Sequence, residues 1–341
     1  MDTSPSTANA APTTQPKTRY PIGQRIRRLR HERGLTQEAL AAPEFTKGYV
    51  SALERGAVRP SLKAMELLAA RLGVPITDFL APPQQLDNGS DLEAVKEDIL
   101  FQSNYAKMLI RTGQVDEAMK LIDTIESDAR DYSGKLPPNV KYMIPFLRGR
   151  AYLQARSARQ ARPELETALA IAEGDQEATA RTHNLLGVVF FELDLPQFAL
   201  EQHLLCLEAL HSGAVKDPYF RLAVYRNLAS DYWALNDAGH AISMYKEALP
   251  ILEDLNDMEE QARVFWGMAM AYRMSKDTAL AKLYASRALN IYELADNRSE
   301  AASTCLNLAE IFMEEQRYEE SEQLLERAGR YLTSTGNQAL L

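Results

Sequence analysis

The side chains best suited to bind another molecule through charge are arginines near the N-terminus. The segment from Ile22 to Gly34 reads IGQRIRRLRHERG, in which apolar residues recur at helical spacing. The other faces of that helix carry Arg25, Arg27, Arg28, Arg30 and Arg33. Residues 1 to 80 carry 12 Lys and Arg against 7 Asp and Glu, net +5, whereas the rest carries 26 against 40, net −14. A basic module is therefore joined to an acidic body, which repels nucleic acid and confines such contact to the basic end.

The elements that follow the arginine-rich helix are short. Leu35 to Gly56 reads LTQEALAAPEFTKGYVSALERG and predicts two short helices separated by a tight turn. Two further short helices are predicted at Ser61 to Leu72 and at Pro75 to Leu80. The predicted core residues are Leu29, Leu40, Val50, Leu53, Leu62, Leu67 and Leu68. We expect residues 21–82 to form a small domain that binds DNA.

This segment resembles the Cro/C1-type (XRE-like) helix-turn-helix family. The matching motifs are T-Q-E-x-L-A, Y-V-S-x-L-E-R-G, R-P-S-L and L-G-V-P, in that order, between Ile22 and Pro82. The resemblance implies five helices, with the second helix of the pair starting at Thr46 and entering the major groove. Toward DNA it places Thr46, Lys47, Gly48, Tyr49, Ser51, Ala52 and Arg55, with Gln37 and Arg59 near phosphates. Pro43-Glu44-Phe45 departs from the usual turn and leaves the angle between the two helices open.

Base recognition by this helix would rest on few side chains. Lys47 can donate to guanine O6 and N7, while Gly48 and Ala52 have no side-chain hydrogen bonds to offer. Each arginine of the first helix, Arg28 among them, is either a phosphate contact or part of a solvated face. We therefore expect low sequence specificity at each half-site, with a contribution from the recognition of DNA shape. We also expect the protein to bind as a homodimer to half-sites about 34 Å apart.

From Leu92 onward one pattern of small and large residues recurs. A representative set is Ala229, Tyr232, Ala241 and Ala248, and such sets follow one another at intervals of 43, 38, 42, 40 and 40 residues. Small residues at these positions let two antiparallel helices approach closely, and each hairpin buries its apolar face by stacking on its neighbours. The pattern predicts five or six helical hairpins over residues 92–334.

These hairpins resemble the tetratricopeptide repeat (TPR) family, as in YRNLASDYWALNDAGHAISMYKEALPIL from Tyr225 to Leu252. The period near 40 exceeds the usual one of about 34 residues, which implies longer helices or longer connections. The resemblance implies an all-α, right-handed superhelix whose first helices line a concave groove. The groove residues expected from that register are Arg150, Asn184, Arg226, Asn227, Trp233, Trp266, Arg273 and Asn307. Asparagine and arginine can hold a peptide backbone and carboxylates, and tryptophan offers apolar anchors, but each residue could equally pair only with its neighbours.

A helix-turn-helix followed by such hairpins resembles the peptide-pheromone-responsive RRNPP group of regulators. That resemblance implies a DNA-binding transcriptional regulator whose TPR-like domain senses a peptide or protein ligand. The alternative is a protein-interaction scaffold in which the groove binds a partner protein and DNA contact is incidental. Gene context would help to choose between them.

The remaining segments and residues point to no other chemistry. Residues 1–20, 83–91 and 335–341 are expected to be a disordered tail, a linker and a C-terminal tail. Two cysteines, no signal peptide and no long apolar run indicate a reduced, cytoplasmic protein without membrane contact. No catalytic motif occurs, so neither an enzyme nor a cofactor is expected. His203, Cys206 and His211 share a helix face, but Cys206 falls on a repeat anchor, so core packing is favoured over a metal site.

Overall fold

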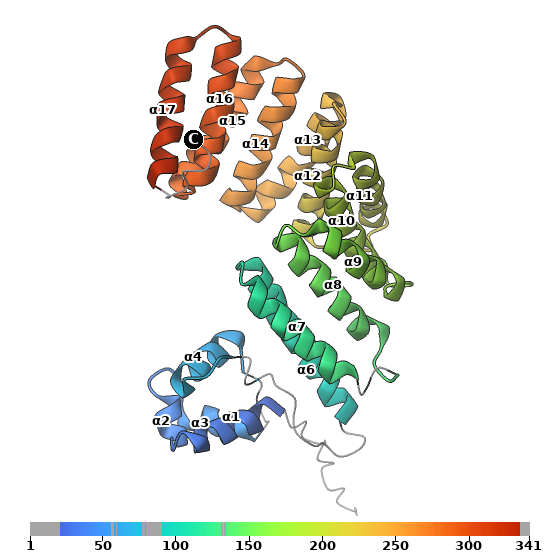
Figure 1. The fold of residues 1–341 in the computed structure, drawn as a ribbon, viewed down its shortest axis with the longest axis vertical. Coiled ribbons are helices and arrows are strands. Elements are labelled where there is room, and N and C mark those ends of the chain that lie inside the picture. Colours follow the sequence, from blue (N-terminus) through green and yellow to red (C-terminus); the bar gives the residue numbers. More distant parts are fainter. Residues whose placement is uncertain are drawn as a thin grey trace, which may run out of the picture. The chain divides into compact units, whose positions relative to one another are not determined.

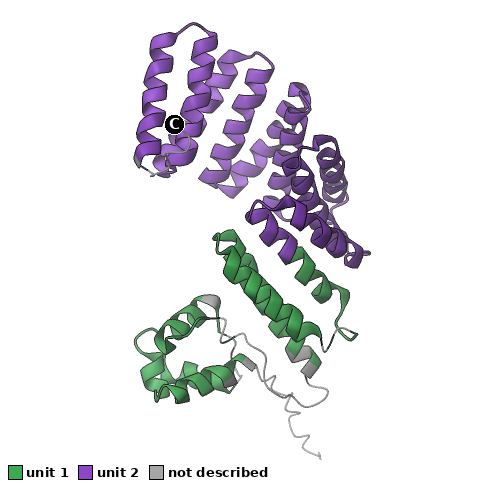
Figure 2. Ribbon diagram, in the orientation of Figure 1, with its two compact units in different colours: residues 1–147 green, residues 148–341 purple. Residues whose placement is uncertain are grey.

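The computed structural model describes residues 21–55, 58, 60–76, 79, 91–130, 132 and 134–334. Throughout these ranges the regular secondary structure is helical, as expected for an all-α protein (Figure 1). The chain divides into two compact units, residues 1–147 and residues 148–341 (Figure 2). The predicted tails, and the predicted linker up to residue 90, lie outside the described residues. In the described part, no helix is both long and apolar enough to span a bilayer.

The first unit begins with the short helices of the predicted DNA-binding domain. They are α1 Pro21–Glu32, α2 Gln37–Ala41, α3 Lys47–Glu54 and α4 Leu62–Leu72, followed by α6 Asp91–Arg111 and α7 Val115–Arg130. The predicted helix from Pro75 to Leu80 falls partly outside the described residues, although Phe79 is helical and fully buried. Of the predicted core residues, Leu29, Leu40, Val50, Leu53 and Leu68 are buried, Leu67 is half-buried, and the side chain of Leu62 lies outside the described part.

The rest of the chain is a series of helical hairpins. The helices are α8 Pro138–Gln154, α9 Ala158–Ile171, α10 Gln176–Glu192, α11 Pro196–His211, α12 Pro218–Ala234, α13 Ala238–Leu255, α14 Met258–Met274, α15 Thr278–Leu294, α16 Arg298–Glu314 and α17 Tyr318–Ser334. The border between the two units falls inside α8. Counting α6 and α7, the described residues form six hairpins, the upper of the two predicted numbers.

The long repeat period has a simple origin in the second unit. Helices α14 to α17 each span 17 residues, and three residues connect each of them to the next. Each connection contains a residue with positive φ, at Lys276, Asp296 and Gln316. The side chains of Asp277 and Asn297 then cap the following helices by accepting backbone hydrogen bonds. A unit of 20 residues therefore repeats twice per hairpin, so lengthened helices rather than long connections explain the period near 40.

Close approach of paired helices depends on small residues, as the sequence pattern predicts. Ala241, Ala248 and Ala281 are fully buried. Glycine allows still closer contact at Gly267 of α14, where an added Cβ atom would lie 2.1 Å from Tyr245 Oη of α13. Space at this crossing is therefore filled by the tyrosine, and the side chain of residue 267 must be a hydrogen atom.

We predict that Gly267→Ala destabilises the second unit by about 1–3 kcal/mol, because the new methyl group overlaps the Tyr245 ring. Urea unfolding followed by the fluorescence of Trp233 and Trp266 would measure the change. Gly329→Ala is the matched control, because an added Cβ atom at this helical position meets no atom within 4 Å. The control should gain about 0.5–1 kcal/mol from helix propensity. Equal effects of the two substitutions would contradict the packing explanation.

Candidate nucleic-acid interface and ligand groove

The predicted recognition helix α3 begins where the sequence places it. Thr46 is its N-cap, and the Thr46 Oγ1 atom accepts a hydrogen bond from the backbone N–H of Tyr49 at 3.2 Å. Thr36 caps α2 in the same way, through the N–H of Ala39 at 3.0 Å. Helix α3 packs against both α1 and α2. The helix pair is thus fixed locally by side-chain caps and globally by its buried apolar residues.

A buried ion pair joins α1 to α3. Arg30 Nε donates to Glu54 Oε1 at 2.6 Å and Arg30 Nη2 donates to Glu54 Oε2 at 3.0 Å. The two side chains are only 8% and 3% exposed, so the pair is shielded from water. Gln37 Nε2 also donates to Glu54 Oε2, at 2.7 Å, which ties in α2. Burial would raise the pKa of Glu54, but the hydrogen bonds from Arg30 and Gln37 outweigh it and lower the pKa.

Two arginines of α1 serve the fold, which corrects the prediction that each either contacts phosphate or belongs to a solvated face. Arg25 is 6% exposed and donates from Nη1 to the backbone oxygen of Phe79 at 2.7 Å. Arg30 is equally buried and bound to Glu54. Their partners lie 54 and 24 residues away in sequence, so local patterning gave no sign of them. Arg27, Arg28 and Arg33 are exposed.

The remaining predicted DNA contacts differ in exposure. Thr46, Lys47, Gly48 and Arg55 are exposed, Gln37, Tyr49, Ser51 and Ala52 are half-buried, and Arg59 lies outside the described residues. Lys47 Nζ lies 4.0 Å from Glu38 Oε2, and Arg28 Nε lies 3.6 Å from Glu32 Oε1. Both ion pairs are exposed to solvent and are therefore weak. Tyr49 stacks on Phe45 with ring centroids 5.1 Å apart. The N-terminal turn of α3 is therefore accessible, and its tyrosine is held by the inter-helix turn.

Arg71 of α4 is a supporting residue that the sequence interpretation missed. Its Nη1 atom donates to the backbone oxygens of Leu40 and Ala41 at 2.8 and 2.9 Å, at the C-terminal end of α2. Its guanidinium also pairs with Glu44 and lies over the Phe45 ring. Arg71 therefore secures the unusual Pro43-Glu44-Phe45 turn. The basic residue in the last turn of α4 was the only sequence signal.

Two open pockets lie in the second unit. The first, called here the His203 pocket, has a volume of about 530 Å³ and is lined by Arg156, Val188, Phe191, Glu192, His203, Asn227, Ser230 and Asp231. The second, the Trp233 pocket, has a volume of about 740 Å³ and is lined by Trp233, Ala234, Asn236, Met270, Arg273, Met274, Lys276, Thr278 and Glu314. Helix α12 contributes to both, and Ser230 and Ala234 lie one helical turn apart. The pockets therefore adjoin along α12.

Three of the predicted groove residues line these pockets, namely Asn227, Trp233 and Arg273. Arg150, Asn184, Arg226, Trp266 and Asn307 are half-buried and lie outside both linings. Asn184 instead accepts a hydrogen bond at Oδ1 from Asn227 Nδ2 at 3.0 Å, which joins α10 to α12. The Nε1 atom of Trp266 is buried and has no hydrogen-bond partner among the described residues.

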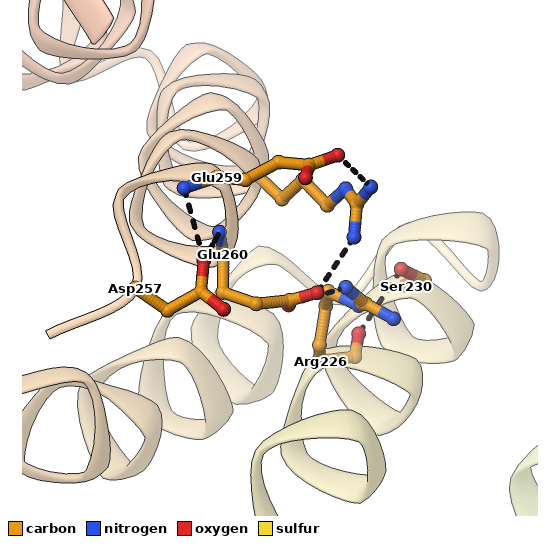
Figure 3. Close-up of polar contacts among 6 residues, drawn as sticks. Arg226, Ser230, Asp257, Glu259 and Glu260 are labelled. Carbon is orange, nitrogen blue, oxygen red and sulfur yellow. Dashed lines mark hydrogen bonds and ion pairs between the residues drawn. The ribbon is translucent and has the colours of Figure 1, made fainter. Parts of the chain in front are cut away.

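Two of the three predicted groove arginines are bound to carboxylates of neighbouring repeats. Arg226 donates from Nη1 to Glu260 Oε2 at 2.7 Å, and the backbone N–H of Glu260 is in turn held by the Asp257 cap (Figure 3). Arg273 binds Glu314 at 2.5 Å from Nη2 and also pairs with Glu310. These pairs link α12 to α14 and α14 to α16. A ligand carboxylate would have to compete for either guanidinium with side chains already in place.

Two of the three possible metal ligands of α11 are engaged elsewhere. His203 Nδ1 lies 2.5 Å from Asp231 Oδ2, and both side chains are 1% exposed. Cys206 is fully buried and donates from Sγ to the backbone oxygen of Ala180 at 3.2 Å, and burial raises the pKa of its thiol to about 12. His211 is exposed. Across the described ranges, no group of three His, Cys, Asp or Glu residues is placed to hold a metal ion.

Comparison with known proteins places this arrangement in a family. Residues 21–80 match the helix-turn-helix domain family and residues 220–294 match the tetratricopeptide repeat family. An uncharacterised HTH-type transcriptional regulator of Sinorhizobium fredii is 37% identical over 70 residues, which cover 20% of this chain and 91% of that protein. The HTH-type transcriptional regulator DdrOP3 of Deinococcus deserti is 41% identical over 58 residues, 17% of this chain and 45% of that protein. The chain belongs to the HTH-type transcriptional regulators and is a DNA-binding protein of that class.

Solved structures share the repeat fold. The apo form of the quorum sensor NprR from B. thuringiensis has a TM-score of 0.57 at 14% identity, covering 92% of this chain and 75% of that chain. The apo form of RapI has a TM-score of 0.55 at 12% identity, covering 92% and 77%. A signal-transduction ATPase with a tetratricopeptide repeat sensor, from Pyrococcus horikoshii, has a TM-score of 0.59 at 19% identity, covering 72% and 37%. The predicted resemblance to RRNPP-type regulators is thus confirmed for the fold.

We predict that Glu54→Ala destabilises the α1 to α3 domain by about 3–5 kcal/mol, because it leaves Arg30 buried without its partner. Hydrogen exchange of α1 and α3 would measure the loss, with α14 to α17 as an internal reference. The double substitution Arg30→Met with Glu54→Leu should recover most of it, since no buried charge remains.

The same pair should make this domain sensitive to acid. The folded-state pKa of Glu54 is lowered, so its contribution is present above the unfolded pKa of about 4.3 and is lost as pH falls through the folded value. Protection of α1 and α3 from exchange should therefore decline below that pH, and less so in the double variant. An equally acid-sensitive double variant would contradict this assignment.

Proposed function

We propose that α3 is the helix that reads an operator in the major groove. The observation that carries the proposal is the exposed N-terminal turn of α3, with Thr46 and Lys47, supported from behind by the buried contacts of Arg30, Glu54 and Gln37. A rigid helix end with accessible donors meets the geometric need of base recognition. Arg55 and Arg28 would add contacts with phosphates.

We further propose that the protein acts as a homodimer. Gly48 brings no side-chain donor and Ala52 is half-buried and apolar, so a single half-site offers few hydrogen bonds. Two copies on a palindrome would double the contacts and supply the missing specificity.

Residues 21–82 are proposed as the DNA-binding domain and residues 92–334 as the TPR-like domain. Action on chromosomal DNA would place the protein in the cytoplasm.

The repeat domain is proposed to be a sensor for a peptide or protein ligand rather than a catalyst. Support comes from two adjoining pockets that combine apolar and polar side chains, as ligand sites do. Similarity to NprR, described as a quorum sensor, supports the same role. The ligand must bind two states of the protein with different affinity if it is to change DNA binding.

Selection of bound fragments from genomic DNA by the full chain tests operator binding. With the enriched fragment, we predict that Lys47→Ala weakens binding about 5- to 100-fold, the range for loss of one good base contact. Lys246→Ala on α13 removes the same charge from an exposed residue outside the DNA-binding domain and should change the affinity less than twofold. Fluorescence anisotropy at fixed salt measures both.

If no fragment is enriched, or if the two lysine variants behave alike, operator reading by α3 is wrong. A complex with another protein that survives nuclease treatment, together with DNA binding of no sequence preference, would instead favour the scaffold alternative.

For the sensor role, we predict that a ligand recovered from a peptide library with the full chain shifts operator affinity by about 5- to 150-fold, the usual range of coupling between sites. By linkage, operator DNA must shift the affinity for that peptide by the same factor. Titration calorimetry in both orders checks this reciprocity. A peptide that binds tightly yet leaves operator affinity unchanged would refute the sensing role.

A further inference from the structure

The lining of the His203 pocket includes a buried carboxylate, one oxygen of which has no hydrogen-bond partner among the described residues. Asp231 is fully buried, and its Oδ2 atom lies 2.5 Å from His203 Nδ1. Its Oδ1 atom accepts no hydrogen bond from any described residue, although Asp231 lines the pocket. A buried acceptor left unsatisfied is costly, and native proteins leave few of them. Asp231 Oδ1 can therefore accept a hydrogen bond that the described residues do not provide.

The polar residues nearest in the lining already donate hydrogen bonds to other groups of the protein. Asn227 donates from Nδ2 to Asn184 Oδ1 at 3.0 Å, and Ser230 donates from Oγ to the backbone oxygen of Arg226 at 3.1 Å. His203 faces two oxygens, Asp231 Oδ2 and the backbone oxygen of Asn184 at 3.2 Å, so both ring nitrogens are occupied. Asn227 keeps its Oδ1 acceptor and one Nδ2 hydrogen, and Ser230 Oγ keeps acceptor lone pairs, so acceptors outnumber donors beside Asp231. A ligand group with several N–H donors and no need for a donor in return would match them.

Two further residues of the pocket lining also favour a cation. Glu192 lines the pocket, and its Oε1 atom lies 3.6 Å from Arg156 Nη1. The Arg156 side chain is 87% exposed. Such an exposed pair is weak, so an incoming cation can replace Arg156 beside Glu192. The ring of Phe191 also lines the pocket and is 37% exposed, and an aromatic face attracts cations.

We propose that the His203 pocket binds a primary ammonium group, with Asp231 Oδ1, Asn227 Oδ1 and Ser230 Oγ accepting its three hydrogens. The proposal rests on the sensor role of the repeat domain and specifies which end or side chain of the ligand is recognised. The shared chemistry has two sources in a peptide, the N-terminal α-ammonium and the ε-ammonium of lysine. Met270, Met274 and Trp233 of the adjoining pocket would receive an apolar side chain of the same ligand.

Three short peptides and the full chain test this assignment by ligand-detected NMR titration. The probes are Ala-Leu-Leu-amide, its N-acetylated form, and N-acetyl-Lys-Leu-Leu-amide. The unacetylated peptide should bind at least about tenfold more tightly than its acetylated form, the effect of losing one charge-assisted contact. Comparable binding of the lysine peptide would identify a site for any ammonium group, and its failure would restrict the site to the peptide N-terminus. Equal binding of the acetylated and free Ala-Leu-Leu peptides, or no saturable binding of either ammonium probe, would overturn the proposal.

Substitutions in the pocket provide the second readout. Asp231→Asn should abolish the difference between the free and acetylated peptides, and Ser230→Ala should reduce it about threefold. Ser230→Ala preserves the buried His203 and Asp231 pair, so it remains informative if Asp231→Asn fails to fold. Glu247→Gln, at an exposed position of α13 outside both pockets, should leave the difference unchanged. A folded Asp231→Asn variant that retains the full difference would refute ammonium binding, while a library peptide that still shifts operator affinity would leave the sensor role intact.

Discussion

The contact between Arg30 and Glu54 holds the DNA-binding domain in its working shape. It joins α1 to α3, and through Gln37 it reaches α2, so one carboxylate fixes three of the four described short helices. Removing two charges from water carries a large desolvation cost, which only good geometry and further hydrogen bonds can offset. Here both carboxylate oxygens and three guanidinium nitrogens have partners. The orientation of α3, and with it any base recognition, depends on this contact.

A second set of ion pairs performs a similar task between repeats. Arg226 binds Glu260, Arg273 binds Glu310 and Glu314, and Lys282 binds Glu315 at 2.7 Å. Each pair crosses from one hairpin to the next, so a groove ligand that displaced one would alter the contact between hairpins. That gives the repeat domain a physical route by which binding can favour one arrangement over another, which is the requirement for coupling. In the His203 pocket, Asp231 Oδ1 is already free of such a partner among the described residues.

Local sequence predicted the fold well because the signals were local. The small residues at the helix crossings followed from spacing, and the resemblance to a helix-turn-helix placed the start of α3 at Thr46. The structural roles of Arg25 and Arg30 could not be predicted in this way, because their partners lie 54 and 24 residues away in the sequence. The bond between Asn184 and Asn227 spans 43 residues. Asp231 Oδ1, which has no partner in the described part of the chain, owes its place to the packing of α11 on α12. Candidate side chains were therefore recognisable by type, whereas their pairing required the packed structure.

Site-specific photo-crosslinking to the selected operator tests most directly whether α3 is the DNA-reading helix. Gly48→Cys suits the probe, because Gly48 is exposed and an added Cβ atom there meets only Thr46 Oγ1, at 3.8 Å. Cys206 and Cys305 are buried with raised thiol pKa values of about 12 and about 11, so the label is directed to the new cysteine. We predict crosslinks to bases within each half-site from residue 48, and none from the same probe at Lys63→Cys on α4. Crosslinks to bases from residue 63 and not from residue 48 would contradict the account.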